Sequence, residues 1–263
     1  AIKTCDGTLE IKNSIIRNNS DCEYSTIFSE CNNGGTKLIL NNCFLTQNGG
    51  AAVGISNGNL DIYKTVIVDN YNQGMYFSSG GGDTLNVSNS TITNNVGQEI
   101  LFQINAEEES HALIKNSIIY NDTYSELGIN AYTPITISIS YSNLLNNFWI
   151  GEYLDIENVT FDLENNINEP PLLNDDYTLQ STSPCIDSGD PESELDPDGT
   201  RADMGAYYYH QTSGCTDPEA CNYNEEATID DGSCTGPYLC DDMETLVCDL
   251  DDCIILGCTN PDA

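Results

Sequence analysis

Residues 9–19, LEIKNSIIRNN, hold the pattern from which the architecture follows. Leu9 and Ile11 alternate with polar residues, which is the period of a strand with one buried face. Asn13 and Ser14 interrupt that alternation and predict a turn, because Asn tolerates left-handed backbone and Ser bonds to nearby backbone groups. Ile15 then begins a second short strand on another face. The unit therefore predicts two short strands joined by a tight corner.

The same unit recurs along the first two-thirds of the chain. It reads LILNNCFLTQN at 38–48, LDIYKTVIVDN at 60–70, LNVSNSTITNN at 85–95, ALIKNSIIYND at 112–122, ISISYSNLLNN at 137–147 and, more loosely, LDIENVTFDLE at 154–164. The corner residues are Asn13, Asn42, Lys64, Asn89, Asn116, Tyr141 and Asn158, spaced 17 to 29 residues apart. One coil alone cannot cover its apolar side, so coils must stack with like residue over like, and stacked Asn side chains are expected to form amide ladders. We predict an all-β solenoid of about seven coils, each with three short strands.

The unit resembles the right-handed parallel β-helix repeats of pectate-lyase-like and surface proteins. This resemblance implies a right-handed parallel β-helix over residues 1–165. NINEPPLLNDDYTLQSTSPCIDSGDP (166–191) and DPDGTRADMGAYYY (196–209) resemble the closing segment of many secreted bacterial β-helix proteins. The resemblance implies that residues 166–210 cap the column, whose end would otherwise offer unpaired strand edges.

A cysteine-rich tail follows the predicted cap. GCTDPEACNYNEEATIDDGSC (214–234) resembles a short repeat of large secreted bacterial surface proteins, and GCTNPDA (257–263) resembles the beginning of a further copy. We therefore predict a module at 211–256, the start of another at 257–263, and a natural protein that continues beyond it. Such a module is too small for an adequate core and needs disulfides. Its cysteines are Cys215, Cys221, Cys234, Cys240, Cys248 and Cys253, and the sequence leaves their pairing open.

Twelve cysteines point to an oxidising compartment. The chain has two histidines and no Cys-x-x-Cys pair, so a zinc cluster is disfavoured. Cys22 and Cys31 flank a loop between the first two coils and predict a local disulfide. With Cys5, Cys43 and Cys185 the column has five cysteines, an odd number, so one of them is expected to be free or to pair outside the column. No apolar run has the length of a membrane span. We expect an extracellular or cell-surface protein that does not insert into a membrane through this segment.

The charge balance excludes one class of partner and favours another. Seven Lys and Arg against 42 Asp and Glu give a net charge of −35, which excludes nucleic acid as a partner. Dense carboxylate suits hard cations, and calcium prefers Asp oxygens beside a Gly turn. The candidate calcium ligands are Asp196, Asp198, Asp203, Asp217, Asp230 and Asp231. The alternative is a solvated, solubilising surface of acidic turns.

No catalytic residue is predicted. Polysaccharide lyases need a basic group beside an acidic sugar, but the few basic residues are dispersed and a field of −35 would repel such a substrate. Glycosidases need a facing pair of carboxylates, and no strand carries clustered acids. His111 is predicted to lie in an exposed loop.

These observations favour a non-catalytic structural or adhesive segment of a large secreted or surface protein, one that could assemble into a filament. The expected partners are other copies of the chain, other surface proteins or glycans. The alternative function is a polysaccharide-binding or polysaccharide-degrading β-helix, for which Phe148, Trp149 and Tyr153 could form a sugar-stacking platform. The competing interpretation of these aromatic residues is packing over the column.

Overall fold

The computed structural model describes residues 2–5, 7–20, 25–30, 35–80, 82–105, 108–151, 156–239 and 246–248. The chain divides into two compact units, Ala1–Tyr209 and His210–Ala263. The first is a parallel β-solenoid of about six turns, and the second contains two disulfides. No helix in the described part of the chain is long and apolar enough to cross a membrane.

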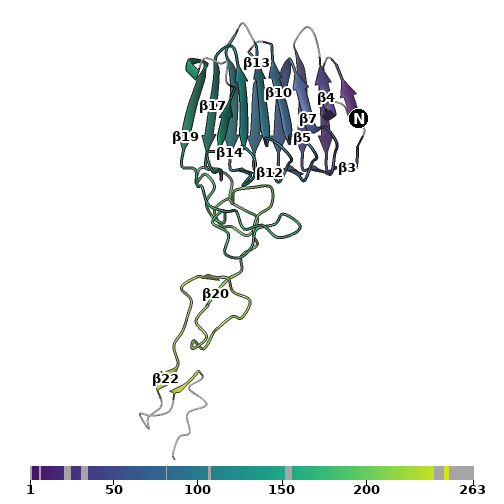
Figure 1. Cartoon of the computed structure of the whole chain (residues 1–263). Coiled ribbons are helices and arrows are strands. Elements are labelled where there is room, and N and C mark those ends of the chain that lie inside the picture. Colours follow the sequence, from purple (N-terminus) through teal and green to yellow (C-terminus); the bar gives the residue numbers. More distant parts are fainter. Residues whose placement is uncertain are drawn as a thin grey trace, which may run out of the picture. The chain divides into compact units, whose positions relative to one another are not determined.

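Three parallel sheets form the walls of the column, and we name them sheets A, B and C (Figure 1). Sheet A contains β1 (Ile2–Thr4), β4 (Ser25–Glu30), β7 (Ala51–Ser56), β10 (Met75–Ser79), β13 (Ile100–Ile104), β16 (Leu127–Ala131) and β18 (Phe148–Ile150). Sheet B contains β2 (Thr8–Lys12), β5 (Thr36–Asn41), β8 (Gly58–Tyr63), β11 (Thr84–Ser88), β14 (Ser110–Lys115), β17 (Ile135–Ser140) and β19 (Val159–Glu164). Sheet C contains β3 (Ile15–Arg17), β6 (Phe44–Thr46), β9 (Val66–Val68), β12 (Thr91–Thr93) and β15 (Ile118–Tyr120). The predicted parallel β-helix with three strands per coil is confirmed, with about six turns in place of about seven.

The interior is filled by rows of apolar side chains in register. In sheet B, Leu60 pairs with both Leu38 and Leu85, and none of the three is exposed. In sheet A the rings of Phe77 and Phe102 meet edge to face at 6.0 Å between centroids. Burying each such side chain contributes about 1.5–3 kcal/mol, so stacking of like residues stabilises every turn by its neighbours.

The corner between sheets B and C is formed in each turn by a residue with left-handed backbone conformation. Positive φ angles of 46–54° occur at Asn13, Asn42, Lys64, Asn89, Asn116, Tyr141 and Asn165. Six of the seven predicted corners are confirmed. The seventh predicted corner, Asn158, is wrong, because this residue lies in the short 3-10 helix η1 (Ile156–Asn158). The alternating residues of β19 form the sheet B strand that follows η1, and the corner comes after them at Asn165.

An asparagine ladder runs along the other corner, between sheets C and A. The Nδ2 atom of Asn48 donates to Oδ1 of Asn70 at 2.9 Å, and Asn70 donates in the same way to Asn95 at 2.7 Å. Asn19 extends the ladder by donating to Asn48 at 2.9 Å. At the B–C corner, Asn42 donates to Asn13 at 2.7 Å. The amide ladders expected from the repeat are thus present, and the longer one uses the Asn that closes each unit.

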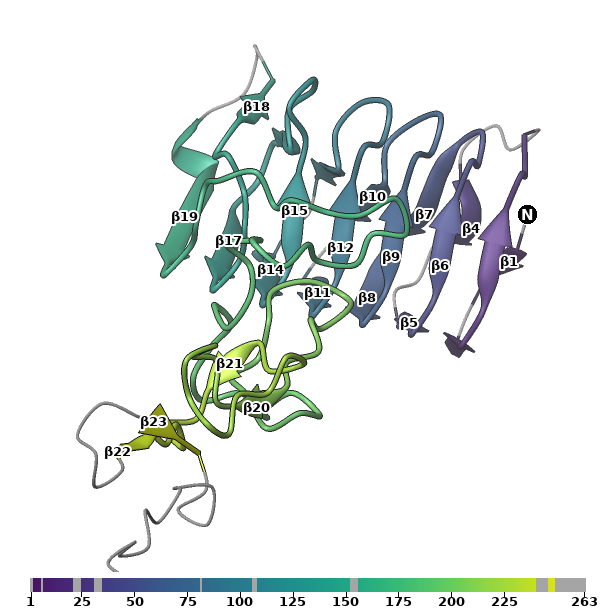
Figure 2. The same cartoon turned by 90° about the horizontal axis from the view of Figure 1, so that it is seen from below.

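Residues 166–209, which we call the strap, lie along the outer face of sheet C (Figure 2). The backbone N–H of Ala206 donates to Oγ1 of Thr91 at 3.0 Å, and the ring of Tyr177 packs on Phe44 with centroids 6.0 Å apart. Leu179 and Met204 form a small core with Ile118.

The expected cap therefore covers the side of the column. The physical reason is that the outward side chains of β9, Val66 and Val68, are apolar and need a cover, while the outward hydroxyl of Thr91 on β12 accepts a hydrogen bond from the strap. Sheets A and B end on β18 and β19, beside which no further strand pairs within the described residues.

The second unit contains two disulfides, Cys215–Cys234 and Cys221–Cys248. Cys215–Cys234 links the residues that follow the parallel pair β20 (Ser213–Gly214) and β21 (Ile229–Asp230). Cys221–Cys248 joins the segment between these two strands to the antiparallel pair β22 (Tyr238–Leu239) and β23 (Leu246–Val247). Four of the cysteines predicted to form disulfides therefore do so, and the structure supplies their pairing, which the sequence left open. The other four, Cys22, Cys31, Cys240 and Cys253, lie outside the described residues. In the column Cys5 is disulfide-bonded, whereas Cys43 and Cys185 are buried free thiols.

Candidate functional site

The predicted calcium ligands in the strap are engaged by backbone groups. One carboxylate oxygen of Asp203 accepts from the N–H of Asp187 and the other from the N–H of Tyr209, both at 2.6 Å. Asp196 accepts from the N–H of Asp203 at 2.9 Å. Burial raises the pKa of Asp203 to about 7, and the backbone donors only partly offset it. Asp198 accepts from both the N–H and the hydroxyl of Thr200. The structure brings Asp196 and Asp203 together, in a loop they help to hold.

The predicted calcium ligands in the second unit each close a local turn. Asp217 accepts from the N–H of Glu219 at 2.9 Å, Asp230 from Gly232 at 3.0 Å and Asp231 from Ser233 at 2.9 Å. Throughout the described residues, no group of three or more His, Cys, Asp or Glu side chains is arranged to hold a metal ion. Calcium binding stays a prediction, now with competing donors at the carboxylates.

The basic side chains mostly pair with neighbouring acids. Lys12 pairs with Glu10 at 2.8 Å and Lys37 with Asp61 at 2.6 Å, while Lys115 forms a close ion pair with Asp190. His111 is exposed as predicted, but it lies on β14 and not in a loop. The alternation of β14 directs its side chain outward between Thr84 and Thr136 on the adjacent strands.

Two buried glutamates, Glu99 and Glu126, were not predicted from the sequence. Glu99 continues the asparagine ladder: Asn121 donates to Oε1 at 2.7 Å, and Asn95 donates to Oε2 in a short bond. Glu126, one turn further on, accepts from the N–H groups of Leu145 at 2.6 Å and Asn147 at 3.2 Å. Burial raises the pKa of Glu99 to about 8 and that of Glu126 to about 7. Both side chains are fully buried, so their role is structural. The sequence feature that could have indicated them is an acidic residue directly before an apolar strand in two successive coils.

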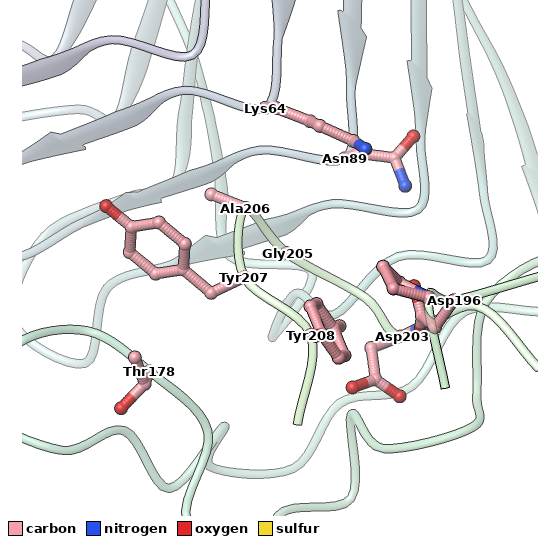
Figure 3. Close-up of a pocket in the computed structure, with 10 residues that line it drawn as sticks. Lys64, Asn89, Thr178, Asp196, Asp203, Gly205, Ala206, Tyr207 and Tyr208 are labelled. Carbon is pink, nitrogen blue, oxygen red and sulfur yellow. The ribbon is translucent and has the colours of Figure 1, made fainter. Parts of the chain in front are cut away.

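A pocket of about 330 Å³ lies between the column and the strap (Figure 3). Lys64 and Asn89, two consecutive B–C corners, form one wall, and Asp203, Tyr207 and Tyr208 belong to the other. The Nζ atom of Lys64 lies 5.4 Å from the centroid of the Tyr63 ring. The pocket combines a cation, an amide, carboxylates and aromatic faces, which suits a small polar group.

The outer face of sheet A carries two rows of side chains that run along the column. The first row is aromatic or apolar with glycines between, and consists of Phe28, Gly54, Tyr76, Leu101, Gly128 and Trp149, paired strand by strand. The second row is polar, and consists of Glu30, Ser56, Ser78, Gln103 and Asn130. The intervening residues, such as Phe77 and Phe102, are fully buried, so the alternation directs both rows outward.

The glycines of the first row make room for neighbouring side chains. A Cβ at position 54 would overlap Oγ of Ser25 and lie 3.0 Å from Cδ2 of Phe28. One at position 128 would lie 2.7 Å from Cγ of Gln98 and 3.0 Å from Cδ1 of Leu101. Phe28 and Leu101 therefore lean over the next strand, and Trp149 at the end of the row is 40% exposed.

The predicted aromatic platform is only partly formed. Trp149 joins the outer row of sheet A, but Phe148 stacks on Phe161 with centroids 4.8 Å apart, because adjacent residues of a strand point to opposite faces. Tyr153 lies outside the described residues.

Comparison with models of known protein families, with curated proteins and with solved structures gives no match to this chain. The function therefore has to be argued from the chemistry of the column itself.

Proposed function

We propose that this chain is a non-catalytic structural or adhesive segment of an extracellular or cell-surface protein. The observation that carries the proposal is the unbroken in-register stack, in which each sheet A strand from β4 to β18 pairs with the strand one turn before it. Such a stack makes a stiff column whose surface side chains repeat about every 4.8 Å. A stiff, repetitive surface is better suited to a structural or adhesive role than to catalysis.

Two further features support the proposed location. The disulfides Cys215–Cys234 and Cys221–Cys248 indicate an oxidising environment. The net charge of −35 keeps a chain soluble outside the cell.

The non-catalytic part of the proposal is supported by the placement of the acids. The described carboxyl groups with the most raised pKa values are Glu99, Glu126 and Asp203. The first two are closed off from solvent, and both carboxylate oxygens of Asp203 accept backbone N–H groups that hold the strap. Incubation of the full chain with neutral and acidic polysaccharides, with and without calcium, tests this part. We expect neither new reducing ends nor unsaturated products. Release of either would overturn it.

We also propose that columns can join end to end, since β18 and β19 leave strand edges without a paired neighbour in the described part of the chain. Each molecule carries a charge of −35, so assembly requires screening by salt or divalent cations. Electron microscopy at low and at physiological ionic strength tests it. Filaments at the higher ionic strength are expected, and dispersed monomers under both conditions would remove this part of the proposal.

A further inference from the structure

We infer that the outer face of sheet A binds a neutral polysaccharide laid along the axis of the column. This inference rests on the proposed adhesive function and names its ligand class. It begins from charge: β7, β10, β13, β16 and β18 contain no charged residue. The remaining described strands of this sheet contribute Lys3 and Glu30, which neutralise each other in an ion pair of 3.2 Å. In a chain with 42 acidic residues, one wall of the column is free of net charge.

The aromatic row supplies faces on which sugar rings can stack. Tyr76 on β10 and Trp149 on β18 belong to the same outward row and are three strands apart, or about 14 Å at the usual strand spacing. Leu101 and Gly128 between them keep the row low, because the Leu101 side chain leans over the glycine. Aromatic side chains thus lie at intervals along a shallow track, an arrangement that fits an extended chain of sugars.

From Ser56 onward the polar row supplies hydrogen bonds without charge, and Glu30 at its start is paired with Lys3. The side chains of Ser56, Ser78, Gln103 and Asn130 are partly exposed and make no side-chain hydrogen bond to any described residue. Hydroxyl and amide groups both donate and accept, which matches the hydroxyl groups of a neutral sugar. The parallel register places these groups beside the aromatic row on every turn.

Electrostatics favours this occupant over two others. An acidic polysaccharide would be repelled by the field of the whole chain, and this face has no free cation to compensate, since Lys3 is already paired. A second copy of the chain lying against this face would bring a further net charge of −35 alongside the first. A neutral polymer meets neither penalty.

Isothermal titration of the full chain tests the inference, with cellohexaose, xylohexaose and mannohexaose as neutral probes and hexagalacturonate as the acidic one. We expect at least one neutral hexasaccharide to bind and hexagalacturonate not to bind. Trp149→Ala and Tyr76→Ala are each expected to weaken binding about fivefold or more. Tyr63→Ala is the matched control, because Tyr63 is 37% exposed on sheet B, and it should leave the affinity unchanged.

Several results would overturn the inference. These are no binding of any neutral probe, equal binding of hexagalacturonate, or unchanged affinity in a Trp149→Ala/Tyr76→Ala double variant. Sedimentation that shows a dimer abolished by Trp149→Ala would assign the face to a second copy instead. Thermal melting followed by circular dichroism checks that each variant is folded, and Gln103→Ala, on a partly exposed side chain, provides a milder variant of the same face. Failure of binding leaves the proposed structural role standing, whereas release of sugar products would overturn that role whether or not the face binds.

Discussion

Glu99 and Glu126 show how one residue type takes different roles in this chain. Most acids of the column and strap lie at the surface or cap turns, but these two are fully buried and lie on adjacent turns. Desolvation favours the neutral carboxyl over the charged form. Each therefore holds its proton to higher pH in the folded state, where Glu99 accepts bonds from Asn95 and Asn121.

The raised pKa of Glu99 predicts a stability that falls with pH. The pKa is 4.5 in its ordinary state and about 8 in the fold, so between these values the folded chain holds a proton that the unfolded chain has lost. The contribution is complete below pH 4.5 and is lost as pH rises to about 8, which amounts to a few kcal/mol. Urea unfolding across this range measures the slope. We expect Glu99→Gln to reduce the slope, with Glu126 and Asp203 keeping the rest, whereas Glu164→Gln, at an exposed position, should leave it unchanged. Parallel slopes for all three proteins would contradict the prediction.

The asparagine ladder predicts a strong contrast between buried and outward amides. Asn70 is fully buried and bonds to Asn48, Asn95 and two backbone carbonyls. Asn70→Ala leaves buried partners unpaired, and we expect a loss of about 2–4 kcal/mol in the free energy of unfolding. Asn86→Ala removes one bond, to Asp61 on the outer face of sheet B, and should cost less than about 1 kcal/mol. Equal losses for the two variants would show that the ladder adds nothing beyond a surface bond.

The strap is the element that decides which face of the column is open. It covers sheet C with Leu179, Cys185 and Met204, and it leaves sheet A uncovered along its uncharged outer face. Burial raises the pKa of the Cys185 thiol to about 11, so both access and ionisation limit its reactivity.

Loosening the strap is therefore expected to unmask one thiol selectively. Met204 is 1% exposed, and Met204→Ala should cost about 2–4 kcal/mol through the cavity it leaves. The variant should label faster at Cys185 with a thiol reagent, while Cys43, buried in the main core at the corner between sheets B and C, keeps its rate. Peptide mapping after timed labelling measures both sites in one sample. A common increase at both cysteines would indicate global unfolding in place of strap opening.

Charge repulsion acts on the chain as a whole. A net charge of −35 disfavours compact states, and dissolved ions screen it. Thermal unfolding should therefore shift to higher temperature as sodium chloride is raised. At equal ionic strength the predicted calcium sites require a further rise with calcium chloride, reduced by Asp196→Asn. The absence of that further rise would favour the solvated, solubilising surface and would refute the calcium prediction.

The repeating unit alone was enough to predict the column. Alternating apolar residues specify the strands of sheets B and C, and a residue in the left-handed conformation at six of the seven predicted corners, four of them Asn, specifies the turn between them. Both are local properties of a few adjacent residues, so they can be read without the partner strands. That cysteines of the second unit form disulfides could likewise be predicted from the sequence.

The remaining features depend on residues that only the packed chain brings together. The strands of sheet A follow loops of variable length, so no fixed spacing marks them. Their uncharged face exists only because residues of five strands, β7, β10, β13, β16 and β18, align in register. The strap lies on sheet C because β9 is apolar on both faces and the outward hydroxyl of Thr91 on β12 accepts a hydrogen bond from the strap. The pairings Cys215–Cys234 and Cys221–Cys248, and the ionisation of Glu99, likewise depend on distances and burial that are set by contacts between segments far apart in the chain.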